Sequence, residues 1–145
     1  MQYVVDTIIN KPVEEVVSLF DSTENLKEWL EGLEKFEHLE GNPGDIGAKS
    51  QLTFKMGDKD LVMVETIASK DLPGEFTATY EMEGVFNTIK TTFHETGADQ
   101  TRMSMDSSFE FQSFPMKIMA FFAPFIFKKQ TRKNLEAFRA FAERN

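Results

Sequence analysis

Glu65 is the residue of this sequence whose type and predicted setting could support acid–base chemistry. A carboxylate that a strand turns into apolar surroundings has its charged form disfavoured and its pKa raised, as a general acid or base requires. Carboxylates in such surroundings are often merely structural. Glu65 is therefore the one catalytic candidate, and its role needs a functional test.

Hairpin register decides whether Glu65 points inward. A two-residue turn at Gly57 and Asp58 places Ser50 opposite Glu65, on the apolar face of the predicted hairpin. One extra turn residue would bring Thr66 inward and leave Glu65 in solvent, because a slip of one residue exchanges the two faces of a strand. The inward position of Glu65 is thus a prediction that depends on a single turn.

Two further hairpins extend the same wall. A two-residue turn over residues 83–84 places Tyr80 opposite Asn87, and a three-residue turn over 97–99 carries the same face on to Ser107. A mostly apolar wall with a few polar points suits a hydrophobic molecule that carries a small polar head. The predicted ligand-binding residues, three of them from the C-terminal segment, are Leu52, Phe54, Met63, Glu65, Tyr80, Asn87, Ile89, Thr91, Met105, Ser107, Phe109, Met119, Phe122 and Ile126.

The other residues that could do chemistry are isolated. His38 and His94 are the only histidines, and His94 should point outward because it neighbours the inward Phe93. Asp6 and Arg102 could form an ion pair or reach the pocket, and their facing stays open. The sequence has no His, Asp and Glu cluster at metal spacing, no phosphate-binding glycine loop and no Ser-His-Asp pattern. Neither a metal nor a cofactor is therefore expected.

Composition limits the class of protein. At 145 residues the chain is expected to form one domain, residues 1–145, with a core of its own. The formal net charge of −8 argues against a nucleic-acid partner. The absence of cysteine fits a reducing compartment, so a cytoplasmic location is expected. The first residues lack a signal-peptide pattern, and no apolar run is long enough to span a bilayer.

The elements that must position these residues are strands and short helices. Residues 2–9 are rich in Val and Ile and predict a strand, and Pro12 opens a short helix. Ser22 or Thr23 is expected to cap a second short helix over 26–30. Strands joined by turns are predicted to follow over 33–39, 50–56, 59–70, 75–82, 85–96 and 101–112.

The C-terminal segment has two parts. Residues 131–145 carry Leu135 and Phe138 on one stripe, which predicts a helix packed against the sheet. Residues 116–127 would turn their phenylalanines away from that stripe, and Pro124 offers a break that resets the phase. Either both halves are then buried, or an exposed back face touches a lipid surface, a second subunit or the mouth of a cavity.

A membrane or homodimer contact is the partner that the second alternative predicts. A basic cluster that could meet anionic lipid head groups lies directly after the surplus apolar residues. The apolar residues are Ile118, Phe121, Phe122 and Phe125, and the basic ones are Lys128, Lys129, Arg132 and Lys133.

The order of strand, two short helices, six antiparallel strands and a long helix resembles the helix-grip fold of the START-like, SRPBCC superfamily. That superfamily includes lipid-transfer START domains, pollen-allergen-type proteins and polyketide cyclase/dehydrase-like proteins. The segments that carry the resemblance are "IINKPVEEVVSLF" at 8–20, "LKEWLEGLEKFEHLEGNPGDIGAKS" at 26–50, "DLPGEF" at 71–76 and "KKQTRKNLEAFRAFAE" at 128–143. The resemblance implies an α+β fold in which a curved antiparallel sheet of about seven strands wraps around the C-terminal helix and leaves a cavity.

These observations predict a cytoplasmic binder or carrier of a small hydrophobic molecule rather than an enzyme. The alternatives are a cyclase- or dehydratase-like reaction in the same cavity, using Glu65, Tyr80 or Asn87, and a membrane- or partner-associated accessory protein. The sequence offers no acid and base paired at dependable positions, which favours binding over catalysis.

Overall fold

The computed structural model describes residues 1–112 and 124–145, which form an α+β structure with one antiparallel sheet and a long helix. This is the predicted helix-grip architecture. The elements in chain order are β1 (Gln2–Ile9), α1 (Val13–Phe20), the short 3-10 helix η1 (Thr23–Asn25), α2 (Leu26–Trp29), β2 (Leu33–Glu40), β3 (Lys49–Met56), β4 (Lys59–Asp71), β5 (Glu75–Met82), β6 (Val85–Gly97), β7 (Gln100–Phe111) and α4 (Pro124–Arg144).

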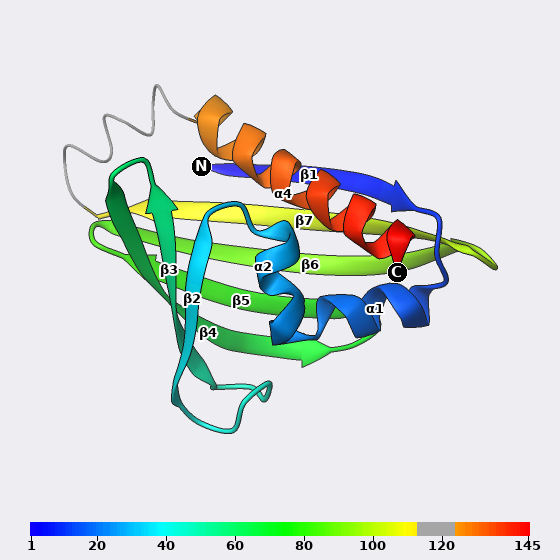
Figure 1. The fold of residues 1–145 in the computed structure, drawn as a ribbon, viewed down its shortest axis with the longest axis horizontal. Helices are drawn as coiled ribbons and strands as arrows, with labels where there is room; N and C mark the ends of the chain where they lie inside the picture. Colours follow the sequence, from blue (N-terminus) through cyan, green and yellow to red (C-terminus); the bar gives the residue numbers. More distant parts are fainter. Residues whose placement is uncertain (113–123) are drawn as a thin grey trace.

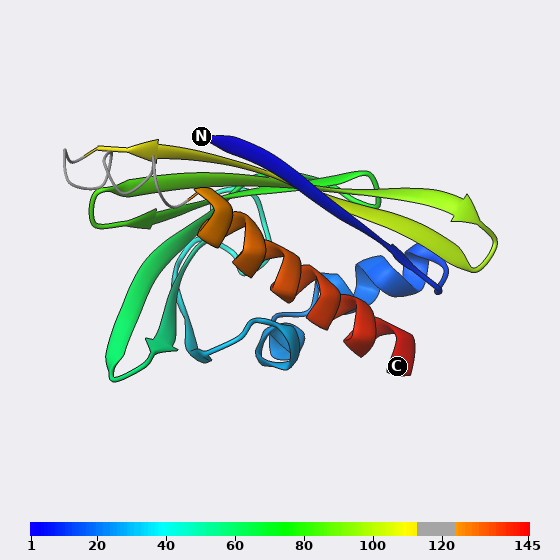
Figure 2. The same ribbon diagram turned by 90° about the horizontal axis from the view of Figure 1, so that it is seen from above.

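The sheet has the strand order β1-β7-β6-β5-β4-β3-β2, so the first strand pairs with the last and β1 and β2 are the two edges. Figure 1 shows α4 running along β1, and α1 and α2 lying beside its C-terminal part. Seen from above, β3 and β4 turn away from the plane of β1, β7 and β6, and α4 crosses the inside of the curve (Figure 2). The sheet therefore wraps around one face of the helix.

The first short helix begins directly after Pro12, as predicted, and the second begins without its predicted side-chain cap. Pro12 precedes α1 with an extended backbone, and Lys11 lies 3.8 Å from Glu15 one turn later. Neither Ser22 nor Thr23 caps α2, because the chain forms η1 first and α2 starts directly from it. The prediction of a cap here was wrong, and α2 ends at Trp29 with Leu30 extended.

The hairpin registers agree with the predictions, with one change in a turn. Met56 pairs with Lys59, and the glycine of that turn, Gly57, takes a φ of 67°, which favours glycine. The three-residue turn predicted over 97–99 is a two-residue turn, because Gly97 pairs with Gln100. A register shift between Glu95 and Gly97 absorbs the missing residue, so the pairing of the rest of β6 with β7 is unchanged.

A second irregularity lies in β4 and changes which side chains share a face. The register shifts between Ile67 and Ser69, which leaves Ala68 as an extra residue opposite β5. With this shift Glu65 pairs with Tyr80. Without it Thr66 would stand opposite Tyr80, because one residue exchanges the two faces of a strand.

The packed core occupies the end of the fold where α1 and the C-terminal half of α4 meet the sheet. Leu135, Phe138, Phe141 and Ala142 are buried, as the helical spacing predicts. Phe20 reaches them from α1, and its ring lies 5.9 Å from that of Phe138 in an edge-to-face arrangement. This end of the molecule is filled by aromatic side chains.

The described part of the C-terminal segment is the helix α4 (Pro124–Arg144). The question of a continuous or broken helix before Pro124 falls on residues outside the described ranges. No helix in residues 1–112 or 124–145 is long and apolar enough to cross a membrane.

Candidate ligand cavity

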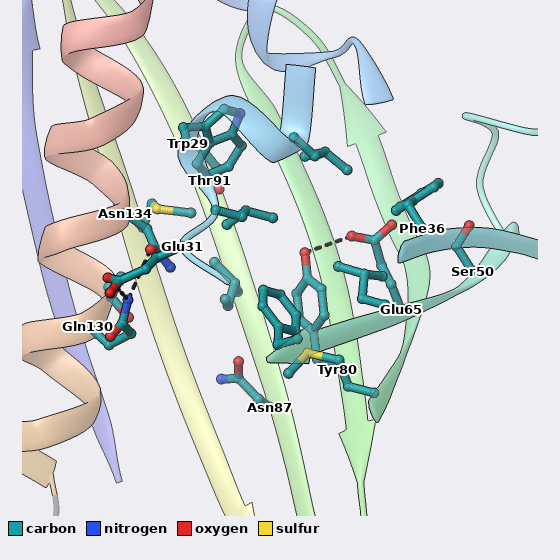
Figure 3. A pocket seen from close by; sticks show the side chains of 18 of the residues that line it. Trp29, Glu31, Phe36, Ser50, Glu65, Tyr80, Asn87, Thr91, Gln130 and Asn134 are labelled. Atoms are coloured by element: carbon teal, nitrogen blue, oxygen red, sulfur yellow. Dashed lines mark hydrogen bonds between the residues drawn. The ribbon is translucent and has the colours of Figure 1, made fainter. Parts of the chain in front are cut away.

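A cavity of about 970 Å³ lies between the concave face of the sheet and the N-terminal half of α4. Side chains from α1, α2 and all seven strands complete its wall. Figure 3 shows labelled side chains of the sheet on one side and Gln130 and Asn134 of α4 on the other, with Trp29 between the two groups. Polar groups are few on this wall, and aromatic and aliphatic side chains supply most of the rest.

Five polar residues of the sheet form one row that crosses the cavity floor from strand to strand. Pairing aligns His38 with Ser50, Ser50 with Glu65, Glu65 with Tyr80 and Tyr80 with Asn87. All five residues line the cavity, each from a different strand between β2 and β6. A ligand on this floor would meet these five polar side chains along a single line.

Apolar rows flank this polar row. On one side Phe36, Leu52 and Met63 are aligned across β2, β3 and β4, and all three line the cavity. On the other side Ile67 aligns with Ala78 and Ile89 across β4, β5 and β6. The polar groups are thus enclosed by hydrocarbon on both sides.

Glu65 and Tyr80 form the central contact of the polar row. The Tyr80 hydroxyl donates a hydrogen bond of 2.8 Å to Oε2 of Glu65 (Figure 3). Burial raises the pKa of Glu65, and the hydrogen bond from Tyr80 opposes part of that rise. Burial, followed by the nearby Glu65 charge and their hydrogen bond, raises the pKa of Tyr80 well above its ordinary value. Tyr80 is therefore a neutral donor, and Glu65 is a carboxyl that protonates more readily than an exposed one.

Asn87 continues the polar row on β6, and hydrogen bonds to β7 fix the orientation of its amide group. Its Nδ2 donates to Oγ of Ser107 at 2.9 Å and to the carbonyl oxygen of Ser108 at 3.0 Å. Both donors are used on β7, which leaves the side-chain oxygen as the group that Asn87 can offer to a ligand. Ser107 is fully buried behind Asn87 and does not line the cavity.

Polar contacts tie α4 to the rest of the cavity wall. The Tyr3 hydroxyl lies 2.6 Å from Oγ1 of Thr131 and donates to the carbonyl oxygen of Phe127 at 3.1 Å. On the other flank Nε2 of Gln130 donates to Glu31 at 3.3 Å, and Nζ of Lys133 lies 3.4 Å from the same carboxylate. These contacts, from Gln130 first, lower the pKa of the exposed Glu31 carboxyl. The helix is therefore clamped at both edges of the cavity.

Trp29 separates the cavity from the packed core. Its ring stacks on Phe20 at 5.9 Å and meets Phe138 edge-to-face at 5.2 Å. The indole Nε1 is buried and has no hydrogen-bond partner in the described part of the chain. An unpaired buried donor costs on the order of 1–3 kcal/mol, which the aromatic packing around Trp29 must offset.

Most of the residues predicted from the sequence lie on the cavity wall. Met119 and Phe122 fall outside the described residues, and Ser107 is buried behind the wall. The lining residues among them are Leu52, Phe54, Met63, Glu65, Tyr80, Asn87, Ile89, Thr91, Met105, Phe109 and Ile126. Their role in binding stays a prediction.

Sequence reasoning missed the polar residues of α4 that face the cavity. Gln130, Thr131 and Asn134 line it, and they recur with Phe127 at the three- and four-residue spacing of one helix face. That spacing was the signal that could have found them. Ser50 was also missed, although it was expected opposite Glu65.

The other chemical candidates lie away from the cavity or at its rim. Asp6, His94 and Arg102 are exposed and do not line the cavity. His38 is exposed at the rim, where its Nε2 lies 2.7 Å from the carbonyl oxygen of Gly41. Phe125 is exposed, whereas the other three residues of the predicted contact, Ile118, Phe121 and Phe122, lie outside the described residues. No group of three or more metal-ligating side chains occurs in the described ranges.

Comparison with known proteins identifies the family of this chain and supports its fold. A family model described as polyketide cyclase / dehydrase and lipid transport matches residues 1–143. No curated protein matches the sequence at a significant level.

Three solved structures illustrate the likeness. The Zhui aromatase/cyclase from Streptomyces sp. R1128 has a TM-score of 0.83 at 12% identity, over 99% of this chain and 94% of that one. A conserved protein from Geobacillus kaustophilus has a TM-score of 0.80 at 13% identity, over 99% and 96%. Ara h 8.0201 has a TM-score of 0.75 at 14% identity, over 100% and 99%. At such identities these structures support the fold and carry no residue roles to this chain.

Proposed function

This chain belongs to the polyketide cyclase / dehydrase and lipid transport family, and on that premise we propose that it binds or carries a small hydrophobic molecule. The observation that carries the proposal is the cavity of about 970 Å³ between the sheet and α4. Its volume lies at the upper end of the range of small-molecule sites, and its wall is mostly apolar.

The wall would bind such a molecule mainly by removing its hydrocarbon from water. Each methylene group transferred from water into an apolar site contributes about 0.8 kcal/mol. The polar row from His38 to Asn87 would then orient the one polar group of the ligand, because an unmatched polar group in this cavity loses its hydrogen bonds with water. Burial of the ligand's hydrocarbon would supply most of the affinity, and the polar row would set the orientation of the ligand in the cavity.

Native mass spectrometry of protein purified from its host tests the proposal. We expect a bound molecule of lipid-like mass that is released by organic solvent. The emptied protein should then bind the apolar dye Nile red with an increase in fluorescence. Protein that is empty after purification and does not bind Nile red would overturn the proposal.

A cyclase- or dehydratase-like reaction is the second candidate function, and the contact between Glu65 and Tyr80 is the observation that favours it. A carboxyl group with a raised pKa beside a neutral phenol can exchange a proton with a substrate held on the cavity floor. The test is turnover of a polyketide-like β-hydroxy ketone by the wild type and by Glu65→Gln. Turnover that the substitution leaves undiminished would remove Glu65 from any catalytic role.

We also propose a peripheral contact with anionic membrane at the start of α4. Phe125 and Ile126 are 74% and 63% exposed, and the basic side chains of Lys128, Lys129 and Arg132 follow within two turns. Such a combination suits a lipid surface, because the apolar side chains enter the acyl boundary while lysine and arginine meet the head groups. Co-sedimentation with phosphatidylserine vesicles at low salt should fall for a Phe125→Ser variant. Equal sedimentation of the two proteins, or none of either, would contradict this contact.

A further inference from the structure

The charged side chains that line the cavity are not equivalent. Apart from the rim histidine His38, they are Asp21, Glu31, Lys55 and Glu65. Asp21 lies 3.1 Å from Nζ of Lys70, Glu31 lies 3.4 Å from Lys133, and Lys55 lies 3.6 Å from Asp60. Three of the four charges are thus balanced by a partner of opposite sign.

Glu65 is the lining charge without such a partner. No Lys, Arg or His nitrogen of residues 1–112 or 124–145 lies within 4 Å of its carboxylate. The neighbours of Glu65 in the polar row, Ser50 and Tyr80, are neutral. A carboxylate in largely apolar surroundings is costly to keep ionised when no positive side chain among the described residues pairs with it.

The hydrogen bonds of Glu65 leave room for a donor from a ligand. Tyr80 donates to Oε2, and no hydrogen bond reaches Oε1 from the part of the chain that the structure describes. Asn87, further along the row, turns its Nδ2 donors toward β7 and not toward Glu65. A ligand group that donates a hydrogen bond to Oε1 and also carries positive charge would satisfy both the free acceptor and the uncompensated charge.

We propose that the cavity takes a hydrophobic molecule bearing a protonated amine, whose nitrogen donates to Glu65, and that it discriminates against fatty-acid-type carboxylates. This inference rests on the proposed function and names the chemical class of its ligand. An anionic head group on the same floor would add a second negative charge beside Glu65, in a protein whose formal net charge is already −8. A neutral hydroxyl would satisfy the hydrogen bond without balancing the charge.

The experiment compares three ligands of equal chain length, each below its micellar concentration at neutral pH. Dodecylamine, dodecanol and dodecanoate are titrated against wild-type protein loaded with Nile red, and displacement of the dye gives the affinity of each. We expect dodecylamine to bind tighter than dodecanol, and at least about tenfold tighter than dodecanoate.

Two variants separate the effect of the Glu65 carboxylate from the effect of net charge. Glu65→Gln keeps a side-chain oxygen that can accept the Tyr80 hydrogen bond, and it removes the charge from the cavity. Glu81→Gln makes the same change in net charge at an exposed residue beside Tyr80 in the chain, on the other face of β5. The preference for dodecylamine over dodecanoate should collapse in the first variant and persist in the second.

The possible outcomes test three statements separately, namely the amine assignment, the role of Glu65 and the proposed carrier function. Dodecanoate or dodecanol binding as tightly as dodecylamine would overturn the amine assignment and leave the carrier function standing. An amine preference that survives Glu65→Gln would overturn the role of Glu65. Wild-type protein that binds neither Nile red nor any of the three ligands would overturn the proposed function itself.

Discussion

The two halves of α4 face the same sheet but meet different surroundings. In the C-terminal half Leu135 and Phe138 are fully buried against β1, α1 and α2. In the N-terminal half Gln130 and Asn134 line a cavity of about 970 Å³. One end of the interior is therefore filled, and the other is hollow.

The difference comes from the side chains that other elements bring to each end. Phe20 from α1 and Trp29 from α2 fill the space over Phe93 and Phe138. Within residues 1–112 and 124–145 no such aromatic cluster covers the polar row on β2 to β6, and the cavity lies between this row and α4. The comparison shows that the sheet can be stabilised at one end while it stays open to a ligand at the other.

At the hollow end, polar contacts at the rim of the cavity connect α4 to the rest of the fold. Tyr3 anchors Phe127 and Thr131 on one flank, and Glu31 joins Gln130 and Lys133 on the other. Such contacts are individually weak, so they can open and close at little cost. We expect the first two turns of α4 to exchange with solvent more readily than the last three.

The largest expected effect is on stability at the filled end. Phe138→Ala removes a fully buried ring and should lower the free energy of unfolding by about 3–5 kcal/mol, because the rigid aromatic cluster cannot close the cavity that is left. Met63→Ala, on the cavity wall, creates no new enclosed space and should cost less than about 1.5 kcal/mol. Urea unfolding measures both. Equal losses would show that the two ends are packed alike.

The next effect concerns binding at the hollow end. Ile89→Trp places a larger side chain on the cavity floor and should weaken Nile red binding at least about tenfold, because a pocket binds less tightly once its volume is occupied. Lys90→Trp makes a comparable change on the exposed face of the same strand and serves as the control. Unchanged binding in Ile89→Trp would place the ligand elsewhere.

A smaller effect is expected at the rim. Tyr3→Phe removes the hydroxyl contacts to Phe127 and Thr131 and should cost about 0.5–1.5 kcal/mol. Hydrogen exchange should speed up at amides around Thr131 and stay slow around Phe138. Uniform acceleration along α4 would mean that the helix opens as one unit and that its halves are not distinct.

The smallest effect is a pH dependence of stability at Glu65. Burial raises the pKa of this carboxyl, so the folded protein binds its proton more tightly than the unfolded chain does. Stability from this group is present below the ordinary pKa of 4.5 and is lost as the pH rises through the raised value. Glu65→Gln should therefore be more stable than the wild type at neutral pH, and the difference should shrink in acid.

Urea unfolding of the wild type and Glu65→Gln across this pH range measures the effect, with Glu81→Gln as the control for net charge. A Glu65→Gln variant that is less stable than the wild type at neutral pH would show that the buried charge stabilises the fold. The hollow end would then tolerate a lone carboxylate better than its apolar surroundings suggest.

Local patterns in the sequence predicted much of the sheet. The turn at Gly57 and Asp58 set the register of β3 and β4, and that register turned Glu65 inward. The spacing of Leu135 and Phe138 predicted the buried face of α4. Short turns and helical periodicity are properties of neighbouring residues, so a sequence can reveal them without knowledge of distant contacts.

The register between hairpins was beyond such reasoning. The contact of Glu65 with Tyr80 depends on the extra residue Ala68 in β4, and no local signal marks that shift. The continuation of the row to His38 depends on the pairing of β2 with β3 across a long loop. Gln130 and Asn134 reach the cavity only because the whole helix lies across the sheet.

The sequence by itself determined the order of strands and helices, the apolar wall and the inward side of Glu65, because each follows from alternation, turns or helical spacing over a few residues. The tertiary structure decided that Glu65 meets Tyr80, that one end of the interior is filled and the other hollow, and that Glu65 has no ion-pair partner among the described residues. These features depend on strand shifts and on which side chains arrive from distant elements, so they exist only once the chain has folded.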